Sequence, residues 1–245
     1  MKKIIASIII ITSLNINAQQ KNLGGNEITK VTYKSSLYQE DVKENLKDLK
    51  NKITQYRESF EFNLYFDKDK SIFKLVDNIG ADDQTIEYHI TRMISNELFY
   101  KDLVKKEKIK QTTSMDELFN VINPFDEYNW VVTNETKVID GYTCYKASCQ
   151  YEEYDGNRKK QLVFNPFVWF APSLPYPFGP SGLDGLPGLV LEGSFNGTVY
   201  FYATKIEFDD KALTKIQRPI HGKYVTREEF DKIIVENYQK MNDMR

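Results

Sequence analysis

The segment Gly179-Pro180-Ser181-Gly182-Leu183-Asp184-Gly185-Leu186-Pro187-Gly188 places glycine at every third position and leads directly into the apolar run Leu189-Val190-Leu191. Glycine at every third residue, with proline between, is the collagen pattern, but a triple helix needs many consecutive triplets and only three occur here. Proline fixes φ, whereas glycine permits positive φ and close backbone approach. We therefore predict a loop of defined shape that leads into a strand.

The residues in and around this loop argue against two chemical roles, phosphate binding and a hydrolase nucleophile. Glycine-rich loops bind phosphate when a helix follows them, whereas an apolar strand pattern follows Gly188. The segment also lacks the P-loop lysine and the Gly-x-Gly spacing of a dinucleotide fingerprint. Ser181 lies between Pro180 and Gly182, without the Gly-x-Ser-x-Gly context of a hydrolase nucleophile. A rigid turn between strands is the simplest interpretation.

Two dipeptides predict hairpins on either side of the loop. Asp155-Gly156 and Asn196-Gly197 tolerate positive φ at both central positions, as a two-residue hairpin turn requires. The second hairpin would join residues 189–195 to residues 198–208. It would connect the end of the loop to the longest aromatic strand of the chain.

Alternating apolar residues predict most of the remaining elements as strands. The predicted strands are residues 27–38, 60–66, 72–76, 86–94, 98–103, 107–111, 130–133, 142–154 and 161–169. In the strand at 72–76 we expect Ile72, Lys74 and Val76 to share a face, after a charged turn at residues 67–70. His89 should face solvent from the strand at 86–94.

Two segments show helical spacing instead. Val42, Leu46, Leu49 and Ile53 recur with charged residues between them and predict a short amphipathic helix. Thr226-Arg227-Glu228-Glu229 is a capping box that predicts the start of a terminal helix. The apolar face of that helix should pack on the sheet, and it is formed by Phe230, Ile233, Ile234, Asn237 and Met241.

The expected fold class is therefore α+β and β-dominant. It consists of a curved, mainly antiparallel sheet with a short N-terminal helix and a C-terminal helix packed as a cover. No repeat, low-complexity tract or linker divides the chain, so residues 25–245 are predicted to form a single domain.

The chain resembles a known family at the glycine-rich loop. Gly185-Leu186-Pro187-Gly188-Leu189-Val190 is similar to the signature of the GLPGLI family, small exported proteins of Bacteroidetes-type bacteria, with Val190 in place of isoleucine. The blocks Val168-Trp169-Phe170, Leu174-Pro175 and Phe178-Gly179-Pro180 precede it in the family's order. The resemblance spans about residues 98–209 and includes Trp130 and residues 139–147. Val168 and Cys149 depart from the family pattern. The family has no established activity.

The resemblance and the rigidity of residues 167–188 together define a candidate site. The segment holds five prolines and four glycines, and long connections of this kind are usually functional or disordered. Its aromatic residues fit a folded core, or they line a groove or present a recognition surface. The candidate recognition residues are Trp169, Phe170, Pro175, Phe178, Gly179, Pro180, Gly185, Leu186, Pro187, Gly188 and Leu189.

The first residues have the three parts of a secretory signal peptide. Lys2 and Lys3 precede the apolar run of residues 4–14, and Ala18 provides a small residue for cleavage. We expect residues 1–18 to be removed after Ala18 and the protein to be exported, to the periplasm. The apolar run is too short for a permanent anchor, and no transmembrane anchor is expected elsewhere.

The charge pattern argues against a nucleic-acid partner, and the cysteine spacing argues against a disulfide bond. The formal net charge is −2 with both signs interspersed, which argues against a nucleic-acid partner. Cys144 and Cys149 would point to opposite faces of one strand, too far apart for a mutual bridge, so no disulfide is expected and both thiols should be free.

The inventory of chemistry-bearing residues predicts no catalytic, metal or cofactor site. The chain has two histidines, His89 and His221, and no cluster of cysteine and histidine that could hold zinc. Residues 67–71 begin like a calcium loop but lack its glycine and its final glutamate. Asp184 and Glu192 near the loop form a hypothetical carboxylate pair.

The resulting hypothesis is a periplasmic, non-catalytic binding or accessory protein of the cell envelope. The family resemblance implies a context near TonB-dependent outer-membrane transporters, and a curved aromatic sheet could hold an apolar small molecule. Two alternatives stay open. One is a structural partner in an envelope complex, which predicts an exposed apolar patch. The other is an enzyme with an unrecognised site of carboxylates and tyrosines, which predicts a deep cleft with abnormal titration.

Overall fold

The computed structural model describes residues 27–38, 44–76, 85–156, 158, 160–210 and 215–243. The predicted signal peptide at residues 1–18 and Val42 of the predicted first helix lie outside the described residues.

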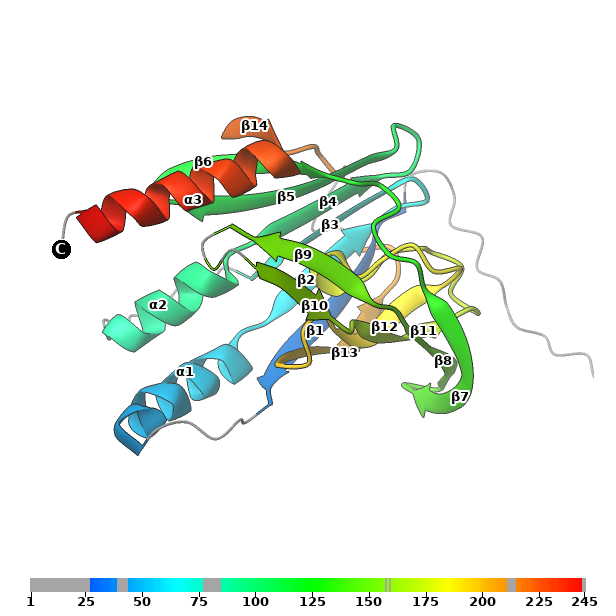
Figure 1. Cartoon of the computed structure of the whole chain (residues 1–245). Helices are drawn as coiled ribbons and strands as arrows, with labels where there is room; N and C mark the ends of the chain where they lie inside the picture. The colour runs from blue at the N-terminus through cyan, green and yellow to red at the C-terminus, as the bar shows by residue number, and fades with distance from the viewer. Residues whose placement is uncertain are drawn as a thin grey trace, which may run out of the picture.

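A twelve-stranded sheet forms most of the molecule (Figure 1). Its order is β14-β6-β5-β4-β3-β2-β1-β13-β12-β11-β8-β7, and every pairing is antiparallel except the parallel one between β14 and β6. The strands are β1 (Thr29–Leu37), β2 (Phe62–Phe66), β3 (Lys70–Leu75), β4 (Leu98–Asp102), β5 (Glu107–Ser114), β6 (Glu117–Asn123), β7 (Val131–Ile139), β8 (Tyr142–Ser148), β11 (Phe167–Ala171), β12 (Leu189–Ser194), β13 (Val199–Glu207) and β14 (Lys223–Thr226). The predicted β-dominant α+β class with a mainly antiparallel sheet is confirmed.

A separate hairpin, β9 (Tyr151–Asp155) with β10 (Lys160–Phe164), lies outside this sheet. The predictions of single strands at 142–154 and 161–169 were therefore wrong, because each segment divides between the large sheet and the small one. The break in the second segment falls at Asn165-Pro166, where proline cannot donate to a sheet ladder. Strands β6 and β14 were not predicted.

Alternation correctly identified the central strands. In β1 the side chains of Thr29, Val31, Tyr33 and Ser35 are buried, and in β2 those of Phe62, Leu64 and Phe66. In β3, Ile72 and Lys74 share a face as expected, Val76 lies beyond the end of the strand, and the opposite face, formed by Ser71, Phe73 and Leu75, is the buried one. Asp67 Oδ1 accepts hydrogen bonds from the amides of Asp69 and Lys70, and this turn pairs Phe66 with Ser71. A shift of one residue exchanges the two faces of a strand.

The predicted strand at 86–94 was also wrong, because the segment is helix α2 (Ile86–Ser95). Thr85 caps the helix by accepting a hydrogen bond from the Tyr88 amide at 3.3 Å. The buried residues Tyr88, Thr91 and Ser95 are three and four positions apart, which is helical spacing. Ile86 and Ile90, which suggested strand alternation, are exposed on the helix surface.

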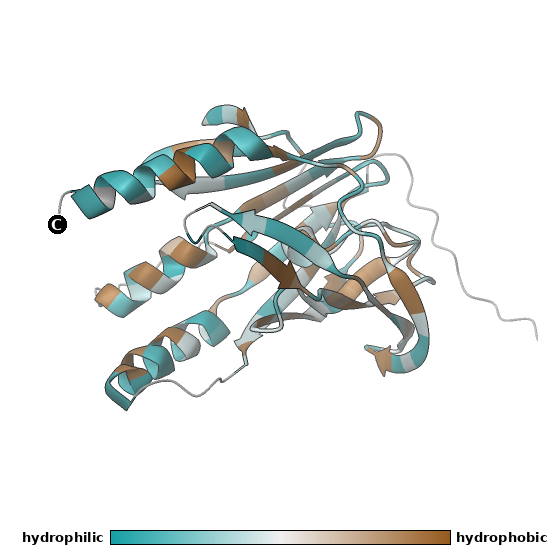
Figure 2. Ribbon diagram, viewed as in Figure 1, coloured by the Kyte–Doolittle hydropathy of each residue, from teal (hydrophilic) through white to brown (hydrophobic). Residues whose placement is uncertain are grey.

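The other two predicted helices occur, but the apolar residues that predicted the first do not form its buried face: Leu46 and Leu49 are exposed, whereas Thr54 and Arg57 are buried. A short turn of 3-10 helix η1 (Glu44–Leu46) leads into α1 (Lys47–Ser59), which packs against α2 and β1. The capping box forms as predicted: Thr226 N donates to Glu229 Oε2 at 2.8 Å and Glu229 N donates to Thr226 Oγ1 at 3.2 Å. It starts α3 (Arg227–Asp243), which covers β6 and β14 (Figure 1). Figure 2 shows α3 as a largely hydrophilic helix with few hydrophobic positions.

Both predicted hairpins occur, but neither has a two-residue turn. The connections are residues 156–159 and 195–198. In the second, Asn196 Oδ1 accepts hydrogen bonds from the amides of Thr198 and Val199, and only Gly197 adopts positive φ, at +76°. Hydrogen bonds to the Asn196 side chain thus stabilise this turn, in place of the positive φ that was expected at Asn196.

The glycine-rich loop has a defined shape. It follows β11, includes the 3-10 turn η2 (Pro180–Gly182), and is tied back to itself by hydrogen bonds from Leu189 N to Leu174 O and from Val190 N to Phe178 O, at 2.8 and 3.0 Å. A Cβ atom at Gly179 would lie 2.1 Å from Leu183 O, and one at Gly188 would lie 2.5 Å from Ala171 O. At both glycines, the absence of a side chain therefore allows two backbone segments to approach each other closely.

Candidate functional site

The candidate recognition residues lie mostly inside the protein. Pro175, Gly185 and Pro187 are exposed, Trp169 is half-buried, and the buried members are Phe170, Phe178, Gly179, Pro180, Leu186, Gly188 and Leu189. Phe178 packs against Phe66 of β2, with ring centroids 5.7 Å apart. The loop as a whole is thus part of the core, and its neighbouring residues Ser181, Gly182 and Leu183 are the ones that face a cavity.

This cavity has a volume of about 410 Å³ and is partly open to solvent. The three loop residues line one wall, and residues from α1, α2, β4, β5, β9, β13 and the start of α3 line the others. Five aromatic residues contribute to the lining: Phe99, Tyr128, Tyr151, Phe195 and Phe201. A volume of this size, with aromatic walls and a few polar groups, is typical of small-molecule sites.

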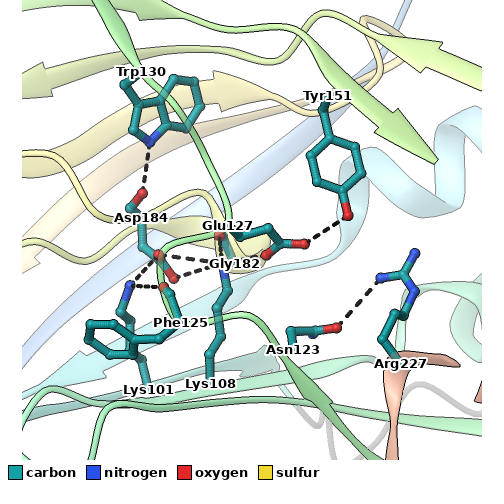
Figure 3. A network of polar contacts seen from close by, with 10 residues as sticks. All are labelled: Lys101, Lys108, Asn123, Phe125, Glu127, Trp130, Tyr151, Gly182, Asp184 and Arg227. Carbon is teal, nitrogen blue, oxygen red and sulfur yellow. Dashed lines mark hydrogen bonds and ion pairs between the residues drawn. The ribbon is translucent and has the colours of Figure 1, made fainter. Parts of the chain in front are cut away.

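A buried ion cluster attaches the loop to the sheet beside the cavity (Figure 3). Lys101 Nζ lies 2.5 Å from Asp184 Oδ1, and Lys108 Nζ lies 3.3 Å from Asp184 Oδ2. Lys108 Nζ also donates to Gly182 O at 2.8 Å. All three charged side chains are less than a tenth exposed, so the charges compensate one another in a poorly solvated environment.

The connection between β6 and β7 closes this cluster from the other side. Trp130 Nε1 donates to Asp184 O at 2.8 Å, and Phe125 O accepts a hydrogen bond from Lys101 Nζ at 3.3 Å. Figure 3 shows the Trp130 indole and the Lys101 side chain approaching Asp184 from different elements. The loop residue Asp184 is therefore held by both its carboxylate and its backbone.

Glu127 extends the network into the cavity. It pairs with Lys108 at 2.7 Å and accepts a hydrogen bond from Tyr151 Oη at 3.1 Å. Burial opposes the charge of Lys108, but Asp184 and Glu127 outweigh it and raise the pKa of its ammonium. Burial, reinforced by Glu127, raises the pKa of Tyr151 to about 12 and that of Tyr128 well above its ordinary value. Both phenols are therefore protonated at neutral pH, and Tyr151 donates to Glu127.

Most cations that line the cavity have carboxylate partners. Lys108 pairs with Glu127, Lys110 pairs with Glu97 at 2.6 Å, and Arg227 pairs with Glu153 and Asp231. Arg57 differs, because within the described part of the chain it forms no ion pair. Its Nη1 donates to Ser95 Oγ at 2.9 Å.

The hypothetical carboxylate pair is not formed. Asp184 belongs to the cluster with Lys101 and Lys108, whereas Glu192 is held in a separate network by Lys137 and Tyr200. That hypothesis was wrong because the two carboxylates are neutralised by different lysines, Asp184 by Lys101 and Lys108 and Glu192 by Lys137. His89 and His221 are both exposed, and neither lines the cavity. Among the described residues no group of three or more potential ligands could hold a metal ion.

Cys144 and Cys149 are free thiols. Cys144 is fully buried in β8, and Cys149 lies beyond the end of that strand and is partly exposed. Burial raises the pKa of the Cys144 thiol to about 11. Neither cysteine belongs to the cavity.

Comparison with known proteins shows the fold alone. No model of a known protein family matches the chain, and no curated protein matches it. Two crystal forms of PNGF-II are similar to it, with TM-scores of 0.53 and 0.54 at 16% and 18% identity over 86% of this chain. The chain spans about a third of PNGF-II, 33% and 34% of the two chains. The alignment with the Mycobacterium tuberculosis lipoprotein LppX has 10% identity and covers 78% of this chain and 91% of LppX. Its TM-score of 0.27 is too low to show a shared fold.

No helix among the described residues is both long and apolar enough to cross a membrane. In fold, the chain is similar to one part of the longer protein PNGF-II. Because a shared fold does not define a function, the residues of the site themselves indicate what it can bind.

Proposed function

We propose that the protein is a non-catalytic binding protein that holds an amphiphilic small molecule in the 410 Å³ cavity. The observation that carries the proposal is the lining: five aromatic rings provide apolar contact, while charged groups at fixed positions can orient a ligand. The glycine-rich loop provides a rigid wall, because Asp184 and Lys108 fasten it to the sheet. A preformed wall reduces the entropy lost on binding.

The proposal includes an exported, periplasmic location and membership of the GLPGLI family, with a role near outer-membrane transport. Its support is the signal-like start of the chain and the loop sequence Gly185–Val190, whose glycines serve close approach and positive φ in the fold. N-terminal sequencing of the protein purified from its native host tests the location. We expect a mature chain that begins at Gln19, and an intact Met1 would contradict export.

An enzyme with a carboxylate and tyrosine site is the alternative. Glu127 and Tyr151 are the carboxylate and phenol in contact in the cavity. Because the pKa of Tyr151 is raised to about 12, the phenol is a donor to Glu127 at neutral pH and a poor base. This contact therefore supports ligand orientation more than proton transfer.

A neutral fluorescent probe tests binding. N-phenylnaphthylamine should bind the wild-type protein with enhanced emission, because its rings fit an aromatic cavity. The variant Ile94→Trp places a large side chain at a lining residue that is 52% exposed on α2, so it should fold and weaken probe binding by about tenfold or more. Ile90→Trp changes the same helix at a position that does not line the cavity, and it should bind as the wild type does. Equal binding by all three proteins would contradict the proposal.

A further inference from the structure

Arg57 is a buried cation whose hydrogen-bonding capacity is largely unused. The residue is 8% exposed, at the end of α1, and lines the cavity. Of its guanidinium donors, Nη1 binds Ser95 Oγ, and Nε is buried with no acceptor among the described residues. A buried guanidinium normally has a carboxylate partner, because its desolvation is otherwise uncompensated.

Neighbouring groups do not provide that partner. Glu97 is the acidic group that acts on Arg57, and it is already paired with Lys110 at 2.6 Å. The rings of Phe62 and Phe201 lie 6.0 and 5.8 Å from Arg57 Cζ, which offers only cation-π contact. Burial lowers the pKa of Arg57, yet a guanidinium remains charged at neutral pH.

Counted over the residues that the structure describes, the lining has an excess of one positive charge. Arg57, Lys108, Lys110 and Arg227 contribute four cations, and Glu97, Glu127 and Glu153 contribute three anions. The unmatched charge is that of Arg57, since each of the other three cations has a partner in the lining. Phe201 lines the cavity directly beside it, so an apolar wall and an unmatched cation are adjacent.

We propose that the ligand is a hydrophobic organic anion whose acid group binds Arg57 while its apolar part packs on the aromatic walls of the cavity. This inference rests on the proposed function and specifies the ligand class. The planar guanidinium presents donors in a fork that matches the two oxygens of a carboxylate. Ligand binding would then supply the acceptor that the described residues do not provide.

Two probes that differ in one acid group test this assignment. Anilinonaphthalene sulfonate has the rings of N-phenylnaphthylamine and an added sulfonate. The variant Arg57→Met should lower sulfonate affinity about 10- to 100-fold, as expected for a hydrogen bond to a charged group, and change neutral-probe affinity less than about threefold. The matched control is Arg218→Met, because Arg218 pairs with Glu107 outside the cavity and its loss should alter neither affinity.

A competition with wild-type protein keeps the test independent of the variant's folding. Decanoate should displace N-phenylnaphthylamine at lower concentration than decanol of the same chain length. Equal displacement, together with an unchanged sulfonate affinity in Arg57→Met, would overturn the anion assignment and leave the proposed function standing. Failure of both probes to bind the wild-type protein would overturn the proposed function and this inference together.

Discussion

Lys101 Nζ and Asp184 Oδ1 lie 2.5 Å apart, although 83 residues separate them in the sequence and both side chains are almost fully buried. Asp184 belongs to the glycine-rich loop, Lys101 belongs to β4, and Lys108 of β5 completes the cluster. This contact explains how a loop rich in glycine becomes a fixed wall of the cavity. Its removal should therefore affect stability and binding together.

Asp184→Asn should destabilise the protein by about 3–5 kcal/mol, because it leaves two buried ammonium groups without a shared carboxylate. Urea unfolding of the wild type and the variant measures the difference. Glu117→Gln is the control, since its ion pair with Lys223 is exposed and should contribute no more than about 1 kcal/mol. A loss at Asp184 as small as that of the control would contradict a structural role for the cluster.

Two glycines of the glycine-rich loop should respond differently to alanine. Gly179→Ala should destabilise the fold by about 3 kcal/mol or more, because the new Cβ would overlap Leu183 O and the Val190 side chain. Gly185 has φ of +93° and no atom within 4 Å of a built Cβ, so Gly185→Ala should cost about 1–2 kcal/mol of backbone strain alone. Thermal unfolding ranks the two, and a larger loss at Gly185 would contradict the packing described here.

Stability should fall at alkaline pH as buried tyrosines ionise. The pKa of Tyr151 is raised to about 12 in the folded protein, above the unfolded value of about 10. The folded state thus keeps a proton that the unfolded chain has lost, so this contribution is complete below about pH 10 and is lost as pH rises toward 12. Burial raises the pKa of Tyr33 and Tyr128 in the same direction.

Urea midpoints across this pH range measure the effect. Tyr151→Phe should flatten the decline relative to the wild type, whereas Tyr154→Phe, at an exposed position of the same strand, should reproduce the wild-type curve. A decline that is identical in all three proteins would show that Tyr151 does not contribute.

The two thiols should react at different rates with a disulfide reagent at about pH 8. Cys149 is partly exposed and should react first, whereas Cys144 is buried and its pKa is raised to about 11, so its thiolate is scarce. The variant Cys149→Ser should lack the fast phase. Absence of any free thiol in the native protein would contradict the structure.

Local patterns were sufficient to predict the elements whose residues interact with near neighbours. The alternation in β1 and β2, the capping box at Thr226 and the hairpin at Asn196 all depend on short-range geometry. Helix α2 was not predicted as a helix, because its apolar residues Ile86 and Ile90 face outward. Its apolar pattern therefore does not mark its buried face. The sequence did not predict which face of β3 is buried, because the side-chain hydrogen bonds of the Asp67 turn set the register of that strand.

The cavity could not be predicted from the sequence, because its lining depends on contacts between distant segments. Lys108 in the mixed-charge segment 101–110 looks like a surface residue, yet pairing with Asp184 and Glu127 allows its burial. Arg57 gives no sequence signal either, since its burial depends on the packing of α1 against α2 and against the sheet, where Phe62 and Phe201 lie beside it. The predicted recognition residues of the glycine-rich loop are mostly buried, and the loop residues that line the cavity, Ser181, Gly182 and Leu183, were not among them.

The most direct test of ligand binding in the cavity is mass spectrometry of small molecules extracted from the protein purified from its native host. The wild-type protein should yield an acidic, apolar compound in near-equimolar amount, and the same preparation of Ile94→Trp should be strongly depleted of it. Ile90→Trp, purified in parallel, should retain the compound. Recovery of the same extract from all three proteins, or of no small molecule from the wild type, would contradict the claim that this cavity is a binding site.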